Sequence, residues 1–159
     1  GIASASAILI GNKIGAGLEE EAKKDALKIS VFGVMIGIII GIVFFVVAPL
    51  IAMLFKITPE TYQNVIVVLR IMAAALPLRF FGIVQIIGVL RGGGDVLYAI
   101  VTELVAVWCI GVPLSFLGAV YFKFPIVLVY LMVCLEELFK VVATVPRLRS
   151  GKWIKNLIK

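Results

Sequence analysis

The chain has 159 residues, of which 63% are hydrophobic and only 15% are charged, and its mean hydropathy is +1.20. A soluble domain is typically about 45–50% apolar and about 25% charged, so this composition excludes an ordinary soluble protein. The net charge of +6 and the absence of histidine narrow the classes further. Without histidine the commonest transition-metal ligand is missing, and we expect no metal or cofactor beyond H⁺ or Na⁺ as a coupling ion.

Hydrophobic runs predict five helical segments in an all-α, polytopic transmembrane bundle, because a spanning helix needs about 20 mostly apolar residues. The segments cover about residues 1–15, 27–55, 61–90, 96–121 and 125–146. We interpret the first as the end of a longer helix and expect further sequence before Gly1. Residues 1–146 would then form a transmembrane lobe, and residues 147–159 a basic amphipathic tail.

Short polar or glycine-rich turns separate these segments and force neighbouring helices to run antiparallel. In one turn, Thr58 is placed to cap the next helix, with Pro59 at its first position. Another turn, residues 91–95, contains Gly92, Gly93 and Gly94, followed by Asp95. No Lys-Ser or Lys-Thr pair follows, so we predict a tight turn or hinge and not a nucleotide loop. Asp95 is expected to cap the following helix.

Basic residues are distributed very unevenly between the two sides of this alternating topology. The side of the C-terminal tail receives ten, whereas the other side receives only Lys56 and Lys123. Positive residues gather on the cytoplasmic side, so we predict a multi-pass protein of the cell (plasma) membrane with a cytoplasmic C-terminus. The tail mixes bases with apolar residues such as Trp153 and predicts an interfacial helix on the lipid bilayer. No nucleic-acid partner is expected.

Small residues and prolines indicate how the helices pack and bend. Two ladders recur every four residues and predict close helix contacts: Ala3, Ala7, Gly11 and Gly15 in one segment, and Gly33, Gly37 and Gly41 in the next. Pro77 and Pro113 remove an intrahelical hydrogen bond each and predict kinks in the third and fourth segments, which are candidate hinges.

Glu103 is the strongest candidate for a functional charge in the membrane. It lies eight residues after Asp95, about 12 Å along a helix at about 1.5 Å per residue, and therefore inside the hydrocarbon. An unpaired carboxylate there is costly, so it must face a partner, face a cavity or carry a proton. It is a candidate cation or proton site; the alternative is a structural clasp to another helix, for example through Arg79.

Glu136, Glu137 and Lys140 form a second candidate group in the last segment. Their i, i+3 and i, i+4 spacing places opposite charges on one helix face, which fits either a structural ion pair or proton and sodium coupling. Arg79 is expected to pair with an acid inside the bundle, and Arg70 to extend towards the outer interface. Both arginines are candidates for gating or charge pairing.

Four motifs in order resemble the multidrug and toxic compound extrusion (MATE) family. They are Gly11-Asn12-x-x-Gly15-Ala16-Gly17, Leu90-Arg91-Gly92-Gly93-Gly94-Asp95, Trp108-x-x-Gly111-x-Pro113-Leu114, and Glu137-x-x-Lys140 followed by Arg147-x-x-Ser150-Gly151-Lys152-Trp153. The resemblance implies a twelve-helix transporter of two six-helix lobes. This chain would correspond to the end of the eighth helix through the twelfth, with the N-terminal lobe as its partner.

The residues and the resemblance together favour a secondary active transporter, not an enzyme. It would export organic cations or other small amphipathic xenobiotics in exchange for H⁺ or Na⁺, by alternating access. One alternative is a lipid-linked oligosaccharide flippase of the same superfamily, which would need a more cationic cavity. A non-transporting membrane scaffold is the alternative from another class. An enzyme is disfavoured because no nucleophile lies near a base and no metal-ligand cluster is apparent.

Overall fold

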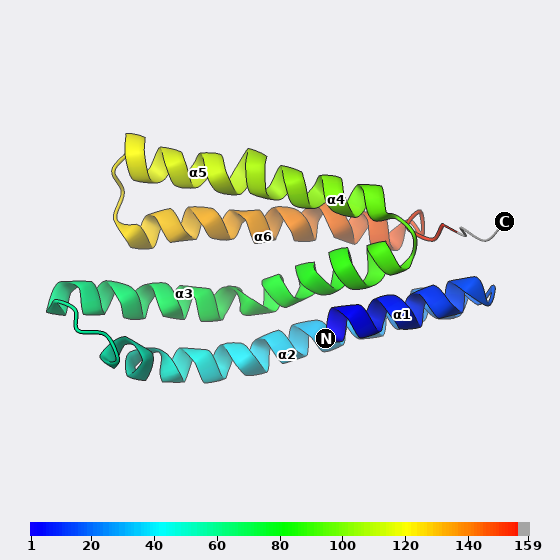
Figure 1. Cartoon of the computed structure of the whole chain (residues 1–159), viewed down its shortest axis with the longest axis horizontal. Helices are drawn as coiled ribbons and strands as arrows, with labels where there is room; N and C mark the ends of the chain where they lie inside the picture. The colour runs from blue at the N-terminus through cyan, green and yellow to red at the C-terminus, as the bar shows by residue number, and fades with distance from the viewer. Residues whose placement is uncertain (156–159) are drawn as a thin grey trace.

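The computed structural model describes residues 1–155, and within them the chain is built from helices (Figure 1). Its elements are α1 (Ile2–Gly15), α2 (Glu19–Met53), α3 (Pro59–Ile83) with η1 (Val84–Leu90), α4 (Val96–Leu104) with η2 (Val105–Gly111), α5 (Val112–Phe116) and η3 (Leu117–Tyr121), and α6 (Ile126–Arg149). The elements η1, η2 and η3 are π-helical stretches within longer rods. This architecture confirms the predicted partial all-α membrane bundle.

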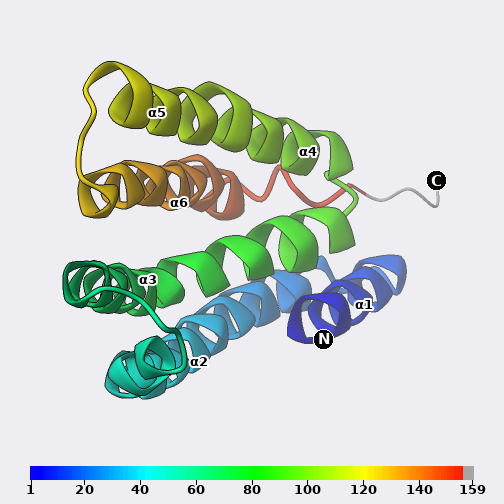
Figure 2. The same cartoon turned by 60° about the vertical axis from the view of Figure 1, so that its left-hand side comes forward.

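The rods lie side by side along the long axis of the molecule (Figure 1). The rod formed by α3 and η1 occupies the middle, where α3 packs against α2 on one side and α6 on the other. The rod from α4 to η3 packs on α6, while the short α1 packs on η1 and α2. Figure 2 shows the same order of rods from a second direction. Consequently α6 is enclosed between two other rods, and its charged residues face protein.

Three of the described helices are long and apolar enough to cross a membrane: Glu19–Met53, Pro59–Leu90 and Val96–Tyr121. Helix α1 has only 14 residues, and α6 carries Glu136, Glu137 and Lys140 near its middle. Many large apolar side chains on the outer faces of the rods are exposed, as expected where lipid covers them. The chain is therefore part of a multi-pass membrane protein.

The helix ends follow local chemistry, and α2 begins earlier than the sequence predicted. Helix α2 begins at Glu19 and not near residue 27, because three acidic residues in its first turn complement the positive end of the helix dipole. Before it, Gly17 adopts φ +76°, a left-handed conformation that glycine tolerates and that ends α1. At the start of α3, the Thr58 hydroxyl accepts a hydrogen bond from the Thr61 amide at 3.4 Å, which confirms Thr58 as the N-cap.

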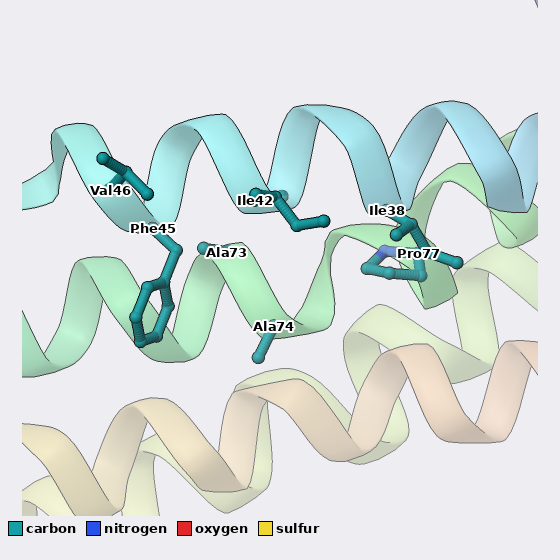
Figure 3. Close-up of a pocket in the computed structure, with 8 residues that line it drawn as sticks. Ile38, Ile42, Phe45, Val46, Ala73, Ala74 and Pro77 are labelled. Carbon is teal, nitrogen blue, oxygen red and sulfur yellow. The ribbon is translucent and has the colours of Figure 1, made fainter.

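The glycine ladder of α2 lies in the contact with α3, as predicted. Gly33, Gly37 and Gly41 are all buried, and a Cβ atom on Gly37 would lie 2.7 Å from the Cα of Pro77. Figure 3 shows the apolar groove beside this contact, with Ile38, Ile42, Phe45 and Val46 on α2 facing α3. The two backbones thus approach as closely as small residues allow.

The ladder of α1 serves the same purpose against η1 and the turn that follows it. A Cβ atom on Gly92 would lie 2.7 Å from the Cα of Ala7, and one on Gly88 would lie 3.3 Å from the carbonyl oxygen of Ala3. A Cβ atom on Gly11 would lie 3.4 Å from the carbonyl oxygen of Gly92. Gly15, the last member of the ladder, is exposed and does not take part in this contact.

Two of the prolines within the rods, Pro77 and Pro113, lie where the helices depart from regular geometry. The α3 ribbon bends between Ala74 and Pro77 (Figure 3), because proline cannot donate the intrahelical bond and its ring clashes with the preceding turn. Pro113 follows η2 by two residues, so a widened π-helical stretch precedes the second proline. Such stretches are uncommon and often occur at functional sites.

The described part of the tail corrects the prediction of an interfacial amphipathic helix. Arg147 and Arg149 still belong to α6, but Ser150–Lys155 leave the helix and fold back onto the Gly92–Gly94 turn. Trp153 is fully buried there, and Ile154 forms an isolated antiparallel bridge with Gly94. The remaining residues of the predicted tail, 156–159, lie outside the described residues. An indole buried against protein is unavailable for the bilayer interface.

Asp95 also has a different role from the predicted helix cap. It occupies the N-cap position of α4, but its side chain makes no capping hydrogen bond. Its carboxylate instead accepts a hydrogen bond from Arg147 Nε at 2.7 Å and forms an ion pair with Lys155 Nζ at 2.6 Å. The Asp95 carboxylate pairs with these basic residues and not with the amides of α4, because two full positive charges bind a buried carboxylate more strongly than neutral amides do.

Candidate functional site

Helix α6 directs three charged side chains towards the neighbouring rods. Glu136 and Lys140 are four residues apart and Glu137 and Lys140 three apart, so all three lie on one face of the helix. That face meets α3 on one side and η2 on the other. The Lys140 side chain is only 9% exposed, and those of Glu136 and Glu137 are nearly as buried. The site is therefore inside the bundle.

The ammonium group of Lys140 lies at the centre of three carboxylates. Its Nζ atom is 2.7 Å from Glu136 Oε1, 3.3 Å from Glu103 Oε1 and 3.9 Å from Glu137 Oε2. Glu136 and Glu137 belong to the same helix as Lys140, whereas Glu103 comes from α4. Within this cluster, the ion pair with Glu103 is thus the one that joins α6 to the rod beside it.

Glu137 connects α6 to the middle rod in the same way. Its Oε1 atom lies 3.5 Å from Nε of Arg79, which follows the Pro77 bend in α3. Arg79 is half exposed, so this second link is the looser one. Glu103 pairs with Lys140 and not with Arg79, which corrects the partner suggested for a structural clasp. Two ion pairs of this cluster, one on each side, thus hold α6 to both neighbours, in addition to the Arg147–Asp95 pair at the end of the helix.

Two glycines give the carboxylates room. A Cβ atom on Gly111, in η2, would lie 2.5 Å from Glu136 Oε2, so any side chain there would displace that carboxylate. A Cβ on Gly82, in α3, would lie 3.5 Å from Glu137 Oε2. In the sequence, Gly111 stands out only as part of a motif, and Gly82 belongs to none of the motifs. Their facing acids lie on another helix, so sequence spacing alone gave no signal.

A cavity of about 460 Å³ opens beside this network. Its charged lining consists of three acids and three bases: Glu103, Glu136, Glu137, Arg79, Arg91 and Lys140. Ile83, Ile86, Ile87 and Val107 supply an apolar part of the wall. The volume falls within the range of about 300–1,000 Å³ that is usual for small-molecule sites. Arg91 was treated in the sequence analysis only as part of a turn, and the structure places it at this cavity.

Carboxylates in a low-dielectric cavity can hold a proton, a metal cation or an organic cation. Glu103 has the most exposed carboxylate of the three, with 42% of its side chain accessible, whereas Glu136 and Glu137 are largely covered. Glu103 is consequently the most accessible of the three acids, and its carboxylate also forms one of the links between α4 and α6.

The remaining candidate residues lie away from the cavity. The guanidinium of Arg70 stacks over the ring of Phe45 at 5.0 Å, in a cation–π contact with α2. Gly93, Gly94 and Asp95 belong to the separate contact with the tail, and Gly92 to the contact with α1. A polar contact that the sequence analysis missed joins α2 to η1, where the Gln85 amide donates a hydrogen bond to Ser30 Oγ. Both of these residues are buried.

Apolar helices long enough to span a membrane, with a cavity of mixed charge between them, define the chain as part of a multi-pass membrane protein. The family model MatE matches residues 1–117, well over half of the chain, and the chain therefore belongs to the MATE family. It is similar to a protein named uncharacterized transporter YisQ of Bacillus subtilis, with 23% identity over 155 residues. That match covers 98% of this chain but 34% of the relative, so the chain spans about a third of the relative's length. No solved structure matches the chain.

Proposed function

We propose that this chain is part of a secondary active transporter that exports organic cations or other amphipathic xenobiotics in exchange for H⁺ or Na⁺. The coarser statement, transport across a membrane, is supported by the MATE family match and by the name of the relative. The same family membership supports a non-enzymatic role. The exchange itself would require the helices that correspond to the rest of the relative, including an N-terminal lobe that closes the cavity from the other side.

The observation that carries the proposal is the cavity in which Glu103 meets Lys140 between two helices. Secondary transporters need a site where the coupling ion and the substrate affect the same structural contact, so that binding one changes the response to the other. Glu103 satisfies this requirement, because its carboxylate is accessible from the cavity and also links α4 to α6. In the proposed orientation the tail lies on the cytoplasmic side of the cell membrane.

The lipid-linked oligosaccharide flippase remains the second candidate. A site for a polyprenyl phosphate would need an excess of positive charge, whereas this cavity has three carboxylates against three bases. The charge balance therefore supports cation export over flipping. A scaffold without transport activity would leave unexplained why six charged side chains line a cavity within a membrane bundle, since each is costly to place there.

The test is dye efflux by the full-length protein that contains this chain, expressed in cells lacking their own multidrug pumps. Glu103→Gln should abolish ethidium efflux driven by an imposed H⁺ or Na⁺ gradient, because the neutral amide holds neither the proton nor the cation. The matched control is Glu60→Gln, which makes the same change at the exposed start of α3 and should leave efflux unchanged. Gradient-coupled efflux that survives Glu103→Gln would refute the assignment.

A further inference from the structure

We infer that Lys140 is a built-in competitor for the transported organic cation, and that it occupies Glu103 until a cation displaces it. The inference rests on the proposed function and concerns how the same site is regulated. Lys140 carries an ammonium group on a flexible four-carbon chain. In the structure this ammonium already occupies the place beside Glu103 that the charge of an organic cation would need, 3.3 Å from the carboxylate that the cavity exposes.

The three acids around Lys140 hold it unequally. Glu136 lies closest, at 2.7 Å, and because it is four residues away on the same helix this pair does not depend on how the rods are arranged. Glu103 is more distant, at 3.3 Å, and belongs to another rod. Lys140 can therefore withdraw from Glu103 and still keep a carboxylate partner, which makes the exchange inexpensive. A lysine with Glu103 as its sole partner could not withdraw without leaving a buried charge unpaired.

The shape and lining of the cavity identify the class of the competing ligand. Glu103 is the most exposed of the three acids, and the adjoining wall contains Ile83, Ile87 and Val107. A cavity of about 460 Å³ is far larger than a dehydrated Na⁺ requires. It suits a monovalent organic cation whose charge reaches Glu103 while its apolar groups contact the isoleucines. Such a ligand gains both an ion pair and buried apolar area.

Replacement of Lys140 by the ligand would also change the contact between the rods. In the resting arrangement Lys140 joins α6 to α4 through Glu103, and Glu137 joins α6 to α3 through Arg79. A cation bound to Glu103 removes the first link and leaves the second in place. Helix α6 then stays attached to α3, and it stays attached to the start of α4 through the Arg147–Asp95 ion pair and the hydrogen bond from the Tyr98 hydroxyl to the Ala143 oxygen. The competition thus converts ligand binding into a local loosening of the bundle at Glu103.

Equilibrium binding of tetraphenylphosphonium to the full-length protein in lipid nanodiscs tests this inference. The informative variant is Glu136→Gln with Lys140→Met, which removes one acid and one base and leaves the net charge and the Arg79–Glu137 pair intact. Without its competitor, Glu103 should bind the probe at least about fivefold more tightly, the lower end of typical coupling effects. Lys123→Met, which removes a lysine from the hairpin before α6, is the control and should bind as wild type does.

The outcomes separate the two proposals. Loss of binding in Glu103→Gln together with tighter binding in the double variant supports both. Loss of binding in Glu103→Gln with unchanged or weaker binding in the double variant overturns the competition and leaves the proposed function standing. Equal binding by wild type and Glu103→Gln, or no binding by either, contradicts the proposed function itself.

A second measurement uses the wild-type protein and so does not depend on the variant folding. Reductive methylation by formaldehyde and cyanoborohydride modifies accessible lysine amines, and mass spectrometry then quantifies each site. Saturating tetraphenylphosphonium should increase methylation of Lys140, because the displaced ammonium loses one carboxylate partner, while Lys123 should be unaffected. Unchanged or reduced methylation of Lys140 when the probe is bound would overturn the inference.

Discussion

Trp153 packs directly against Gly93, so closely that a Cβ atom on the glycine would lie 2.7 Å from the carbonyl oxygen of Trp153. The contact joins residues that are far apart in sequence and brings the end of the chain onto the turn between η1 and α4. A main-chain hydrogen bond from the Lys155 amide to the Gly93 oxygen, at 2.8 Å, fixes the same register. The Trp153 indole also donates a hydrogen bond to the Leu148 oxygen at 3.1 Å.

Gly93→Ala should therefore detach the tail from the turn. The clash involves main-chain atoms that cannot rotate away, and overpacking of this kind typically costs about 1–3 kcal/mol. We expect a lower melting temperature in detergent and a red-shifted tryptophan emission, because Trp153 would become accessible to solvent. Gly11→Ala is the control, since its Cβ would lie at an ordinary 3.4 Å from the nearest atom. An alanine at position 93 with wild-type stability and emission would show that the tail contact is not as tight as described.

Asp95 makes the same region sensitive to acid. Burial by itself raises the pKa of Asp95, but the hydrogen bonds from Arg147 and Lys155 outweigh it and hold the pKa below its usual value. A carboxyl group with a lowered pKa in the folded state stabilises the fold above its unfolded pKa, and this contribution is lost as the pH falls through the folded pKa. The ordinary aspartate pKa is about 3.9, so the loss begins near that pH and continues below it.

Asp95→Asn should remove this contribution at neutral pH. Charged hydrogen bonds contribute about 1.5–3 kcal/mol each when well shielded, and Lys155 is nearly half exposed, so we expect a loss of about 2 kcal/mol. Melting temperatures of wild type and variant, measured from pH 7 to pH 3, provide the check. The difference between them should narrow as the pH falls below about 4. A difference that stays constant over this range would show that the ionised form of Asp95 does not stabilise the fold.

The contact between α2 and α3 should also tolerate little added volume. A Cβ on Gly37 would lie 2.7 Å from Pro77 Cα and 3.0 Å from the Leu76 oxygen, so Gly37→Ala must separate two backbones. We expect a loss of about 1–3 kcal/mol, although alanine has the better helix propensity by about 1 kcal/mol. The measurement is the urea or heat midpoint in detergent. Gly11→Ala again serves as the control, because it gains the same propensity without the clash, and equal midpoints for the two variants would contradict the packing described here.

Local sequence patterns predicted the parts of the fold that depend on local spacing. The four-residue repeat of Gly33, Gly37 and Gly41 predicted a close helix contact, because residues that share one helical face contact the same neighbouring helix. Thr58 and Pro59 predicted a helix start for the same reason, since a cap bonds within its own first turn. The spacing of Glu136 and Lys140 likewise predicted their ion pair.

Partners on different rods could not be predicted in this way. Nothing in the spacing of Glu103 and Lys140 distinguishes that pair from Glu103 and Arg79, because the choice depends on which rod packs against α6. The tail was misassigned for a related reason. Alternating basic and apolar residues suit a helix that lies on lipid and equally suit a non-helical segment that packs on protein. Burial of Trp153 decides between the two, and it depends on Gly93, sixty residues earlier in the sequence. Asp95 was misassigned as a cap because its partners, Arg147 and Lys155, lie more than fifty residues later.

Gly111 provides the last prediction, which concerns function without loss of the fold. A Cβ on Gly111 would lie 2.5 Å from the Glu136 carboxylate, a flexible group that can move aside, and at an ordinary 3.6 Å from the Ala106 oxygen. Lys140 would then depend more on Glu103, so a transported cation would have to displace a more firmly held competitor. Gly111→Ala should raise the KM for ethidium efflux several-fold and change the free energy of unfolding by less than about 1 kcal/mol, as expected when only a mobile side chain shifts. Gly118→Ala is the matched control, because its Cβ would meet the Met132 sulfur on the same pair of rods, away from the cavity. Similar KM changes in both variants would mean that helix spacing, and not the position of Glu136, determines the affinity of the site.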